Sequence, residues 1–223
     1  MTRLAIVRVF VGPGNTGGNP LGIFLDGAAI PPPRRLAVAA ELGFSETVFV
    51  DDRARGSIRI FTPGRELPFA GHPLVGTSWW LAQSGAQVDV LRPPAGDVPT
   101  WQDRDLTWIR GRPEWVHEIA MERLDSPAAV EALAPGPDAT GSYYPWAWID
   151  EAAGIVRSRY FAGAVGIAED EATGAAAVVL GGRLGRPIEI RQGRGSRLLV
   201  RPGSDGTVEV GGACIRVEER EYS

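Results

Sequence analysis

Two stretches of this chain repeat one order of features, and this repeat restricts the possible folds more than any other pattern in the sequence. The stretches are Arg59–Thr77 and Arg159–Ala175. Each begins with a strand pattern ending in Arg-x-Phe and continues through a loop to a titratable side chain, His72 or Asp170, before a glycine and a helix of small residues. The alternative to a true repeat is chance. A true repeat predicts two similar domains with helix N-termini at a shared cleft, where His72 and Asp170 occupy corresponding positions.

The elements around the repeat predict a strand-rich α+β protein with one central helix in each half. Residues 92–100 are rich in proline, glycine and aspartate, which is typical of a domain boundary. We therefore expect one domain over residues 1–100 and a second over residues 101–223. The last part of the chain predicts a terminal antiparallel meander of four strands, whose last strand can also join the first domain. The expected strands are Ile188–Arg191, Leu198–Val200, Thr207–Val210 and Cys214–Glu218.

The composition excludes several classes of enzyme. The chain has 223 residues, and all 23 of its basic residues are arginine. Without lysine there is no amine for a Schiff base, for the usual linkage to pyridoxal phosphate, or for the GxxxxGK[ST] phosphate-binding loop. The single cysteine, Cys214, excludes a catalytic cysteine pair and a multi-cysteine zinc site, and the two histidines are too far apart for an HExxH motif. Catalysis therefore has to use carboxylates, histidine, hydroxyls and backbone amides.

The charge and the N-terminal pattern bear on partners and location. A net charge of −4 argues against binding to nucleic acid or to a membrane surface. The N-terminus lacks the long apolar core of a signal peptide, because Arg8 interrupts the run Leu4–Val11. No apolar stretch approaches the ~18 residues that a transmembrane helix needs. We therefore expect a cytoplasmic protein that binds neither nucleic acid nor a membrane.

Glu46 is the first candidate for acid–base chemistry. It lies in the loop Gly43–Thr47, which joins a predicted helix to a predicted strand, and it is flanked by Phe44 and by the apolar residues 48–50. Apolar surroundings raise the pKa of a carboxyl group, which suits a general base that must also return the proton. The simpler alternative is that Glu46 faces solvent at the start of the strand.

Two further candidates precede predicted helices. His72 comes directly before a proline that starts a helix, where the helix dipole lowers the pKa of a histidine and keeps it neutral. Asp170 precedes the second helix. For both residues the alternative is a role in capping the helix. His117 has no such setting, and we interpret it as structural.

Taken together, these segments resemble the PhzF-like family of phenazine-biosynthesis isomerases. The resemblance spans essentially the whole chain, and the motifs of the first half are highly specific. The matching motifs are Gly18-Asn19-Pro20, Leu42–Val50 (LGFSETVFV), Arg59–Thr77 (RIFTPGRELPFAGHPLVGT), Arg159–Ala177, Gln192-Gly193 and Val210–Gly212.

The resemblance implies the fold of diaminopimelate epimerase, an α+β fold of two similar domains, each a curved, mostly antiparallel sheet around a central helix. It implies that Glu46, in the Ser-Glu-Thr motif, is the acid/base, and that His72 and Asp170 orient the polar groups of the substrate. The amides at the helix start around Gly174 are expected to bind the substrate's carboxylate. The residues expected to bind substrate are Asn19, Gly71, Gly76, Thr173, Gly174 and Ala175.

The resemblance also implies an isomerase that needs no cofactor and no metal, acts on a small carboxylated substrate, and forms a homodimer. In the type enzyme of the family the substrate is a dihydro-hydroxyanthranilate, and the glutamate moves a proton from an activated ring carbon to another carbon. An amino-acid racemase of the same fold uses two cysteines. That alternative is opposed here by the single cysteine.

Three departures from the family pattern fall in the second half. Glu171 replaces a proline, Ala175 replaces a serine, and the segment Phe161–Gly166 (FAGAVG) lacks the family's proline. Ala175 removes a hydroxyl donor from the expected carboxylate site. The first domain therefore resembles a competent one and the second an altered one. The alternative function is a small-molecule-binding relative that keeps the fold without turnover.

Overall fold

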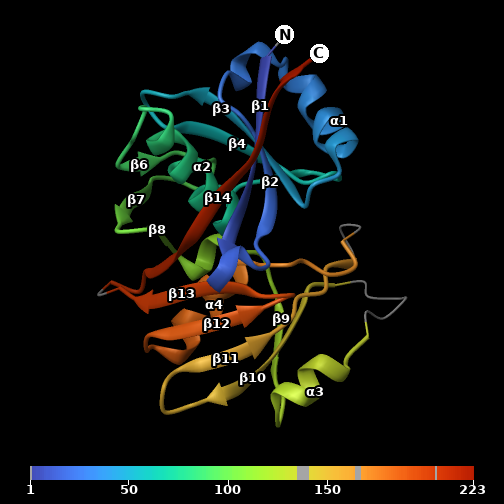
Figure 1. Ribbon diagram of the computed structural model, residues 1–223, viewed down its shortest axis with the longest axis vertical. Coiled ribbons are helices and arrows are strands. Elements are labelled where there is room, and N and C mark those ends of the chain that lie inside the picture. The colour runs from blue at the N-terminus through green and yellow to red at the C-terminus, as the bar shows by residue number, and fades with distance from the viewer. Residues whose placement is uncertain (1, 135–140, 164–166, 204) are drawn as a thin grey trace.

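The chain folds into two halves, which Figure 1 shows one above the other with both chain termini at the outer end of the first half. The computed structural model describes residues 2–134, 141–163, 167–203 and 205–223. The first half contains β1 (Thr2–Val11), η1 (Pro13–Asn15), β2 (Asn19–Phe24), η2 (Gly27–Ala29), α1 (Pro32–Leu42), β3 (Glu46–Asp52), β4 (Ser57–Phe61), β5 (Glu66–Leu67), α2 (Gly71–Gln83), β6 (Val90–Leu91), β7 (Val98–Asp103) and β8 (Leu106–Gly111). The rest of the chain contains η3 (Pro113–Trp115), β9 (Ala120–Arg123), α3 (Pro127–Ala132), β10 (Tyr143–Asp150), β11 (Ile155–Ser158), α4 (Gly174–Leu184), β12 (Ile188–Gln192), β13 (Ser196–Pro202) and β14 (Val208–Tyr222).

One curved sheet passes through both halves. Its strand order is β5-β4-β3-β2-β1-β14-β13-β12-β11-β10-β9, and β8 connects the β6-β7-β8 strands to β14. The pairs β2–β3, β9–β10 and β11–β12 are parallel, and the other strand pairs of the described chain are antiparallel. This confirms the predicted α+β class with a mostly antiparallel sheet. No helix in the described residues is long and apolar enough to cross a membrane.

The hairpin of β1 and β2 carries the first site residue. Gly17 and Gly18 in its loop have φ angles of 57° and 87°, in the left-handed region that favours glycine. A Cβ on Gly18 would also lie 2.5 Å from a methyl carbon of Val11. The turn therefore requires glycine, and it places Asn19 opposite Val9 at the beginning of β2.

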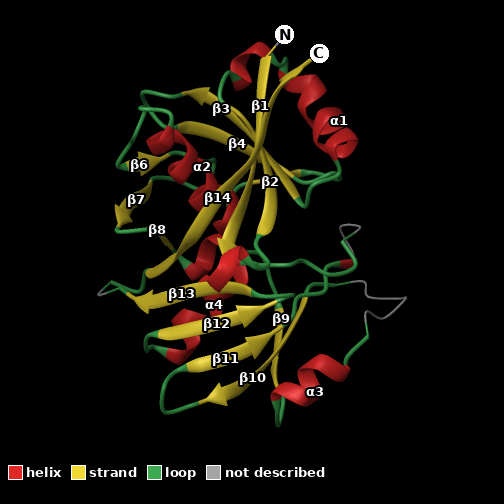
Figure 2. Cartoon of the chain, viewed as in Figure 1, coloured by secondary structure: helices red, strands yellow, loops and turns green. Residues whose placement is uncertain are grey.

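Each half encloses a central helix. The first eight residues of α2 are buried, and in α4 only small and branched apolar side chains are buried. Apolar residues all round a helix indicate that it lies inside the protein. Figure 2 shows the strands around these helices, and α2 packs on β1, β2 and β8 while α4 packs on β13 and β14. The prediction of one central helix per half is confirmed.

The two central helices meet with their N-termini together. A Cβ on Gly71 would lie 2.5 Å from the carbonyl carbon of Gly174, and a Cβ on Gly174 would lie 2.8 Å from that of Gly71. Real Cβ atoms do not approach backbone so closely, so both positions require glycine. The two halves are therefore in direct contact through the backbone atoms of these two glycines.

The internal repeat is real, but its predicted register is wrong. In each half an antiparallel strand pair, β3–β4 or β10–β11, precedes the central helix. Because α2 begins at Gly71 and α4 at Gly174, His72 corresponds to Ala175 and not to Asp170. The loop before α4 is longer than the loop before α2, so matching His72 with Asp170 in sequence shifted the register.

Strand β14 connects the halves. Its beginning pairs with β13 and β8, and its remainder pairs with β1 up to Tyr222. The sequence predicts separate strands over 207–210 and 214–218, which the structure joins into one strand of 15 residues. Residue 100, the predicted end of the first domain, lies within β7, which pairs with β6 on one side and β8 on the other.

Candidate active site

Four segments bring polar side chains together where the central helices meet. Parallel pairing of β2 with β3 sets Glu46 beside Leu21, close to Asn19 at the start of β2. His72 is the second residue of α2, and Asp170 lies in the loop that leads to α4. The cluster therefore draws on both halves, and no local segment of the sequence contains it.

Asn19 is the centre of the hydrogen-bond network. Its amide nitrogen donates to Asp170 Oδ1 at 2.7 Å and to the carbonyl oxygen of Ala172 at 3.0 Å. The Ser45 hydroxyl donates to Asn19 Oδ1 at 3.1 Å. Asn19 is only 2% exposed. Because its bonds reach Asp170 and Ala172, this buried side chain fixes the loop before α4 against the first half.

Glu46 and His72 face each other without a hydrogen bond. Glu46 Oε2 lies 3.4 Å from His72 Nδ1, and the two side chains are 13% and 2% exposed. Within the described part of the chain, Glu46 Oε2 and His72 Nε2 are buried and have no hydrogen-bond partner. Buried polar atoms are nearly always paired in folded proteins, so two unpaired ones at one place are an exception that a functional role would explain.

Asp170 is held from the second half. The Thr173 hydroxyl donates to Asp170 Oδ2 at 2.6 Å. The amide nitrogen of Gln192 donates to the Asp170 carbonyl oxygen at 3.0 Å and to Thr173 Oγ1 at 2.9 Å. Gln192 in turn receives a bond from the backbone N–H of Thr173 at 3.2 Å. The loop before α4 is therefore rigidly placed.

The environment changes the pKa values of all three titratable groups. Burial, together with the nearby charge of Asp170, raises the pKa of Glu46 to about 8. Burial also raises the pKa of Asp170 to about 6, although the bonds from Thr173 and Asn19 oppose that rise. Burial lowers the pKa of His72 to about 3, so its ring is neutral at physiological pH. The glutamate can hold or release a proton near neutral pH.

The helix starts add a concentration of N–H donors. The first intrahelical bonds of α2 and α4 are donated by the N–H groups of Leu74 and Ala177, so the amides before them point out of the helices. Each N-terminus carries about half a positive charge. Two such ends at one place favour an anionic group, and a carboxylate fits the donors.

The alternatives for the three titratable residues are wrong. Glu46 does not face solvent, because its side chain is only 13% exposed. Neither His72 nor Asp170 caps a helix, since the capping positions are Ala70 and Thr173 and no side chain there makes a capping bond. All three side chains lie in the polar cluster instead.

The residues expected to bind substrate fall into two groups. Asn19 and Thr173 belong to the network, whereas Gly71, Gly174 and the half-buried Ala175 form the helix starts. Gly76 lies further along α2, where a Cβ would meet side chains of β1 and β2 at 2.6 Å. Its position favours a packing role.

His117 and the segment Phe161–Gly166 were also singled out in the sequence. His117 lies outside the cluster, with its Nε2 atom 3.1 Å from the Ser142 hydroxyl and 3.3 Å from the Tyr160 hydroxyl. Of the segment that lacks the family's proline, residues 164–166 lie outside the described residues. Among the described residues no group of three His, Cys, Asp or Glu side chains is arranged to hold a metal ion.

Glu171, which departs from the family pattern, has defined partners. Its Oε1 atom accepts from the backbone N–H of Arg194 at 2.7 Å and from the Ser196 hydroxyl at 2.8 Å. Ser196 Oγ accepts from the backbone N–H of Gly18 at 2.8 Å. Glu171 therefore supports, through Ser196, a hydrogen bond between the second half and the turn before Asn19.

Sequence reasoning missed the residues that support the network. Ser45 and Gln192 lie in motifs that carry the resemblance, and this was the available signal. Tyr144 and Ser158 had none: their hydroxyls lie 2.8 Å apart on neighbouring strands, and the Tyr144 hydroxyl donates to Gln192 Oε1 at 3.4 Å. Cross-strand contacts of this kind depend on the register of the sheet.

Solved structures of known proteins share this fold. A phenazine biosynthesis protein of the PhzF family from Bacillus anthracis superimposes with a TM-score of 0.80 at 20% identity, covering 100% of this chain and 99% of the other. A probable proline racemase from Agrobacterium radiobacter superimposes with a TM-score of 0.67 at 10% identity, covering 100% and 93%. The predicted epimerase-like fold is confirmed, and the chain belongs to the structural class that contains these racemases and PhzF proteins.

Sequence comparison narrows the class to one family. The model of the family described as phenazine biosynthesis-like protein matches residues 11–111. The trans-2,3-dihydro-3-hydroxyanthranilate isomerase of Pseudomonas aeruginosa is 34% identical over 267 residues, covering 92% of this chain and 94% of that protein. Its counterpart in Pseudomonas fluorescens is 34% identical over 224 residues, covering 79% and 80%. The chain belongs to the phenazine biosynthesis-like (PhzF) family of isomerases, as the sequence motifs predict.

Proposed function

We propose that this isomerase moves a proton between two carbons of a small carboxylated substrate, with Glu46 as the acid and base and without a cofactor. The observation that supports this most directly is the pair of buried, unpartnered atoms Glu46 Oε2 and His72 Nε2. They lie beside two helix N-termini that favour a carboxylate. The positive helix ends, the two unpartnered atoms and the carboxyl group with the raised pKa all lie at one place.

In this reaction Glu46 transfers the proton, and His72 and Asp170 position the substrate. The Glu46 carboxylate takes a proton from an activated carbon, the electron pair of that C–H bond shifts the neighbouring double bond, and Glu46 returns the proton to another carbon. No atom is gained or lost. The pKa of about 8 suits both steps, because proton transfer is most effective when the pKa lies near the working pH. Neutral His72 and the fixed Asp170 orient the polar groups of the substrate.

The names of the relatives suggest the first substrate to test, trans-2,3-dihydro-3-hydroxyanthranilate. The protein is incubated with this compound in heavy water, and deuterium uptake is followed by mass spectrometry and NMR. Glu46→Gln keeps the shape of the side chain but cannot carry the proton, so exchange should fall by about 10²–10⁴-fold. The exposed Glu118→Gln is the matched control and should exchange normally.

His72→Ala should weaken binding and rate together, because an orienting group acts on both. If Glu46→Gln keeps most of the exchange activity while its circular dichroism is unchanged, the proton-shuttle proposal is wrong, and Asp170 becomes the candidate base.

A second function is favoured by one observation: the helix start of α4 has Ala175 where the family has a serine, so one hydroxyl donor is absent. On this proposal the protein binds the carboxylated molecule without turning it over. Calorimetric binding without deuterium uptake would support it, and Ala175→Ser should then strengthen binding.

A further inference from the structure

A cavity of about 770 Å³ opens on the first half, away from the polar cluster. It lies where the C-terminal end of α2 faces β1, β2 and β14. His72 and Gln83 mark the two ends of α2, and at 1.5 Å per residue they are about 16 Å apart. The cavity is therefore separate from the proposed acid–base site, and nothing in the proposed reaction uses it.

The floor of this cavity is formed by apolar and aromatic residues, of which Trp79 is half-buried and the others are buried. Trp79 and Trp80 line it from α2, and Ala5, Ile23 and Cys214 line it from the three strands. The two indole rings lie 6.0 Å apart at an angle of 37°. A floor of this kind favours a flat apolar group, since aromatic rings pack well in offset or tilted arrangements.

The rim of the cavity carries opposite charges, with guanidinium groups in excess. Arg3, Arg53 and Arg216 lie on it, together with Asp26 and Glu219. Arg53 is tightly held, because it bonds Asp26 at 2.7 Å. The whole chain has a net charge of −4, so a rim with three guanidinium groups and two carboxylates is locally distinct.

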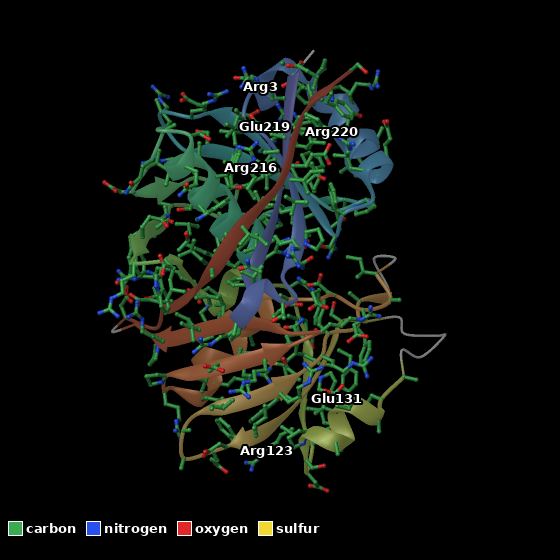
Figure 3. All side chains as sticks on the ribbon, in the orientation of Figure 1. Arg3, Arg123, Glu131, Arg216, Glu219 and Arg220 are labelled. Carbon is green, nitrogen blue, oxygen red and sulfur yellow. The ribbon has the colours of Figure 1, made fainter. Side chains whose placement is uncertain are left out.

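Arg3 and Arg216 share one carboxylate and hold it loosely. Glu219 lies 3.7 Å from Arg3 Nη1 and 4.0 Å from Arg216 Nη1. Figure 3 labels these three side chains along β1 and β14. The two arginine side chains are 72% and 61% exposed. Each guanidinium has five N–H donors in a planar fork, so most of the donors stay open to a second carboxylate.

The position of Arg216 connects the rim to the floor. Its guanidinium carbon lies 6.0 Å from the centre of the Trp80 ring. A carboxylate bound to Arg216 would therefore place an attached ring against the tryptophans. Three features oppose an added carboxylate: the rim carboxylates of Asp26 and Glu219, which already pair with the arginines, and the carbonyl end of α2. Ser84 reduces the last of these, because its N–H and hydroxyl both donate to the Trp80 carbonyl oxygen, at 3.0 and 2.7 Å.

We propose that this cavity is a binding site for a small aromatic carboxylate, distinct from the acid–base site. The ring packs on Trp79 and on the exposed edge of Trp80, and the carboxylate bonds to Arg216 and Arg3. The cavity has aromatic and apolar residues at its floor and charged groups at its edge, as small-molecule sites usually do.

The experiment measures binding of 2-naphthoate by calorimetry and by tryptophan fluorescence. Naphthalene-2-carboxamide has the same ring without the charge, and acetate has the charge without the ring. Naphthoate should bind to one site, and both analogues should bind at least about tenfold more weakly, because each lacks one of the two contributions.

Arg216→Ala should weaken binding of naphthoate about three- to tenfold, within the range for a partly exposed charged hydrogen bond. Arg220→Ala is the matched control. Arg220 lies on the same strand, pairs with Glu218 at 3.7 Å, and does not line the cavity, so binding should be unchanged.

Two further measurements separate this proposal from the proposed function and from a contact between copies of the chain. Glu46→Gln should bind naphthoate as the unmodified protein does. If Glu46→Gln or His72→Ala abolishes binding while Arg216→Ala does not, the probe occupies the acid–base site and the cavity proposal is wrong. The proposal is equally wrong if naphthoate fails to bind and Arg216→Ala changes the sedimenting mass, because this face then contacts a second copy.

Discussion

At the scale of single residues, the site contains two buried carboxyl groups that differ in their hydrogen-bond partners. Asp170 has bonds from Asn19 and Thr173, and the pKa of its carboxyl rises only to about 6. Glu46 is about as enclosed, but its Oε2 atom lacks a partner, and its pKa rises to about 8. Hydrogen bonds to the charged form therefore keep the pKa of Asp170 below that of Glu46, and the nearby charge of Asp170 raises the pKa of Glu46 further.

The raised pKa of Glu46 predicts a fall in stability above neutral pH. The folded protein keeps this proton up to about pH 8, whereas an ordinary glutamate loses it near 4.5. The stabilisation is complete below pH 4.5 and disappears as pH rises through 8. The free energy of unfolding should therefore fall between pH 7 and 9, a range above the pKa values of Asp170 and His72.

Urea unfolding at pH 7 and 9, followed by tryptophan fluorescence, measures this effect. Glu46→Gln has no proton to lose, so its stability should change less over the same range and exceed that of the unmodified protein at pH 9. An equal fall in both proteins would show that Glu46 does not titrate in this range.

At the scale of elements, the contact between α2 and α4 decides the geometry of the site. The two helices meet through glycine backbones, which brings their N-terminal amides to one place. Any side chain at either position would separate the helices. The hairpin of β1 and β2 then completes the site, because it places Asn19 against the loop before α4.

Gly174→Ala should destabilise the protein by about 1–3 kcal/mol, the usual cost of overpacking, since the new methyl group would lie 2.8 Å from backbone atoms of α2. Gly64→Ala is the control, because no atom lies within 4 Å of a Cβ there. Urea unfolding of both variants gives the comparison. Equal stability of the two variants would contradict the close helix contact.

The bonds of Glu171 predict that it orders the loop before Asn19. In Glu171→Ala the Ser196 hydroxyl loses an acceptor, and its bond with the Gly18 N–H should weaken. We expect amide hydrogen exchange of Gly18 to become about tenfold faster, as for the loss of one hydrogen bond. Glu171→Gln keeps the acceptor oxygen and should exchange at nearly the original rate. Unchanged protection in the alanine variant would refute the link.

At the scale of the whole molecule, β14 makes the two halves interdependent. Its first residues close the sheet of the second half, and its remainder pairs with β1 in the first. The site lies where the halves meet, so any change in their relative position alters the distances among Asn19, Glu46, His72 and Asp170. The division into domains near residue 100 stays a prediction.

The homodimer also stays a prediction, and the strand order gives it a physical basis. The sheet path ends at β5 and β9, whose outer edges are able to pair with another chain. Analytical ultracentrifugation at micromolar concentration should give the mass of two chains. A mass of one chain under these conditions would contradict the prediction.

The class of the protein and most of the chemical groups of the candidate site could be predicted from the sequence. Absent lysine and a single cysteine excluded several mechanisms, local patterns indicated an α+β fold with one central helix in each half, and the motifs identified Glu46, His72 and Asp170. These features are local, because composition, periodicity and short motifs do not depend on how distant segments meet.

Which of these groups lie together could be seen only in the tertiary structure. It matched His72 with Ala175, joined two predicted strands into β14, and revealed the support that Gln192 gives to the loop before α4. The length of the loops before α2 and α4 sets the match of His72 with Ala175. The register of the strands sets the extent of β14 and the position of Gln192. Both depend on contacts between distant segments, and so does the burial that raises the pKa of Glu46.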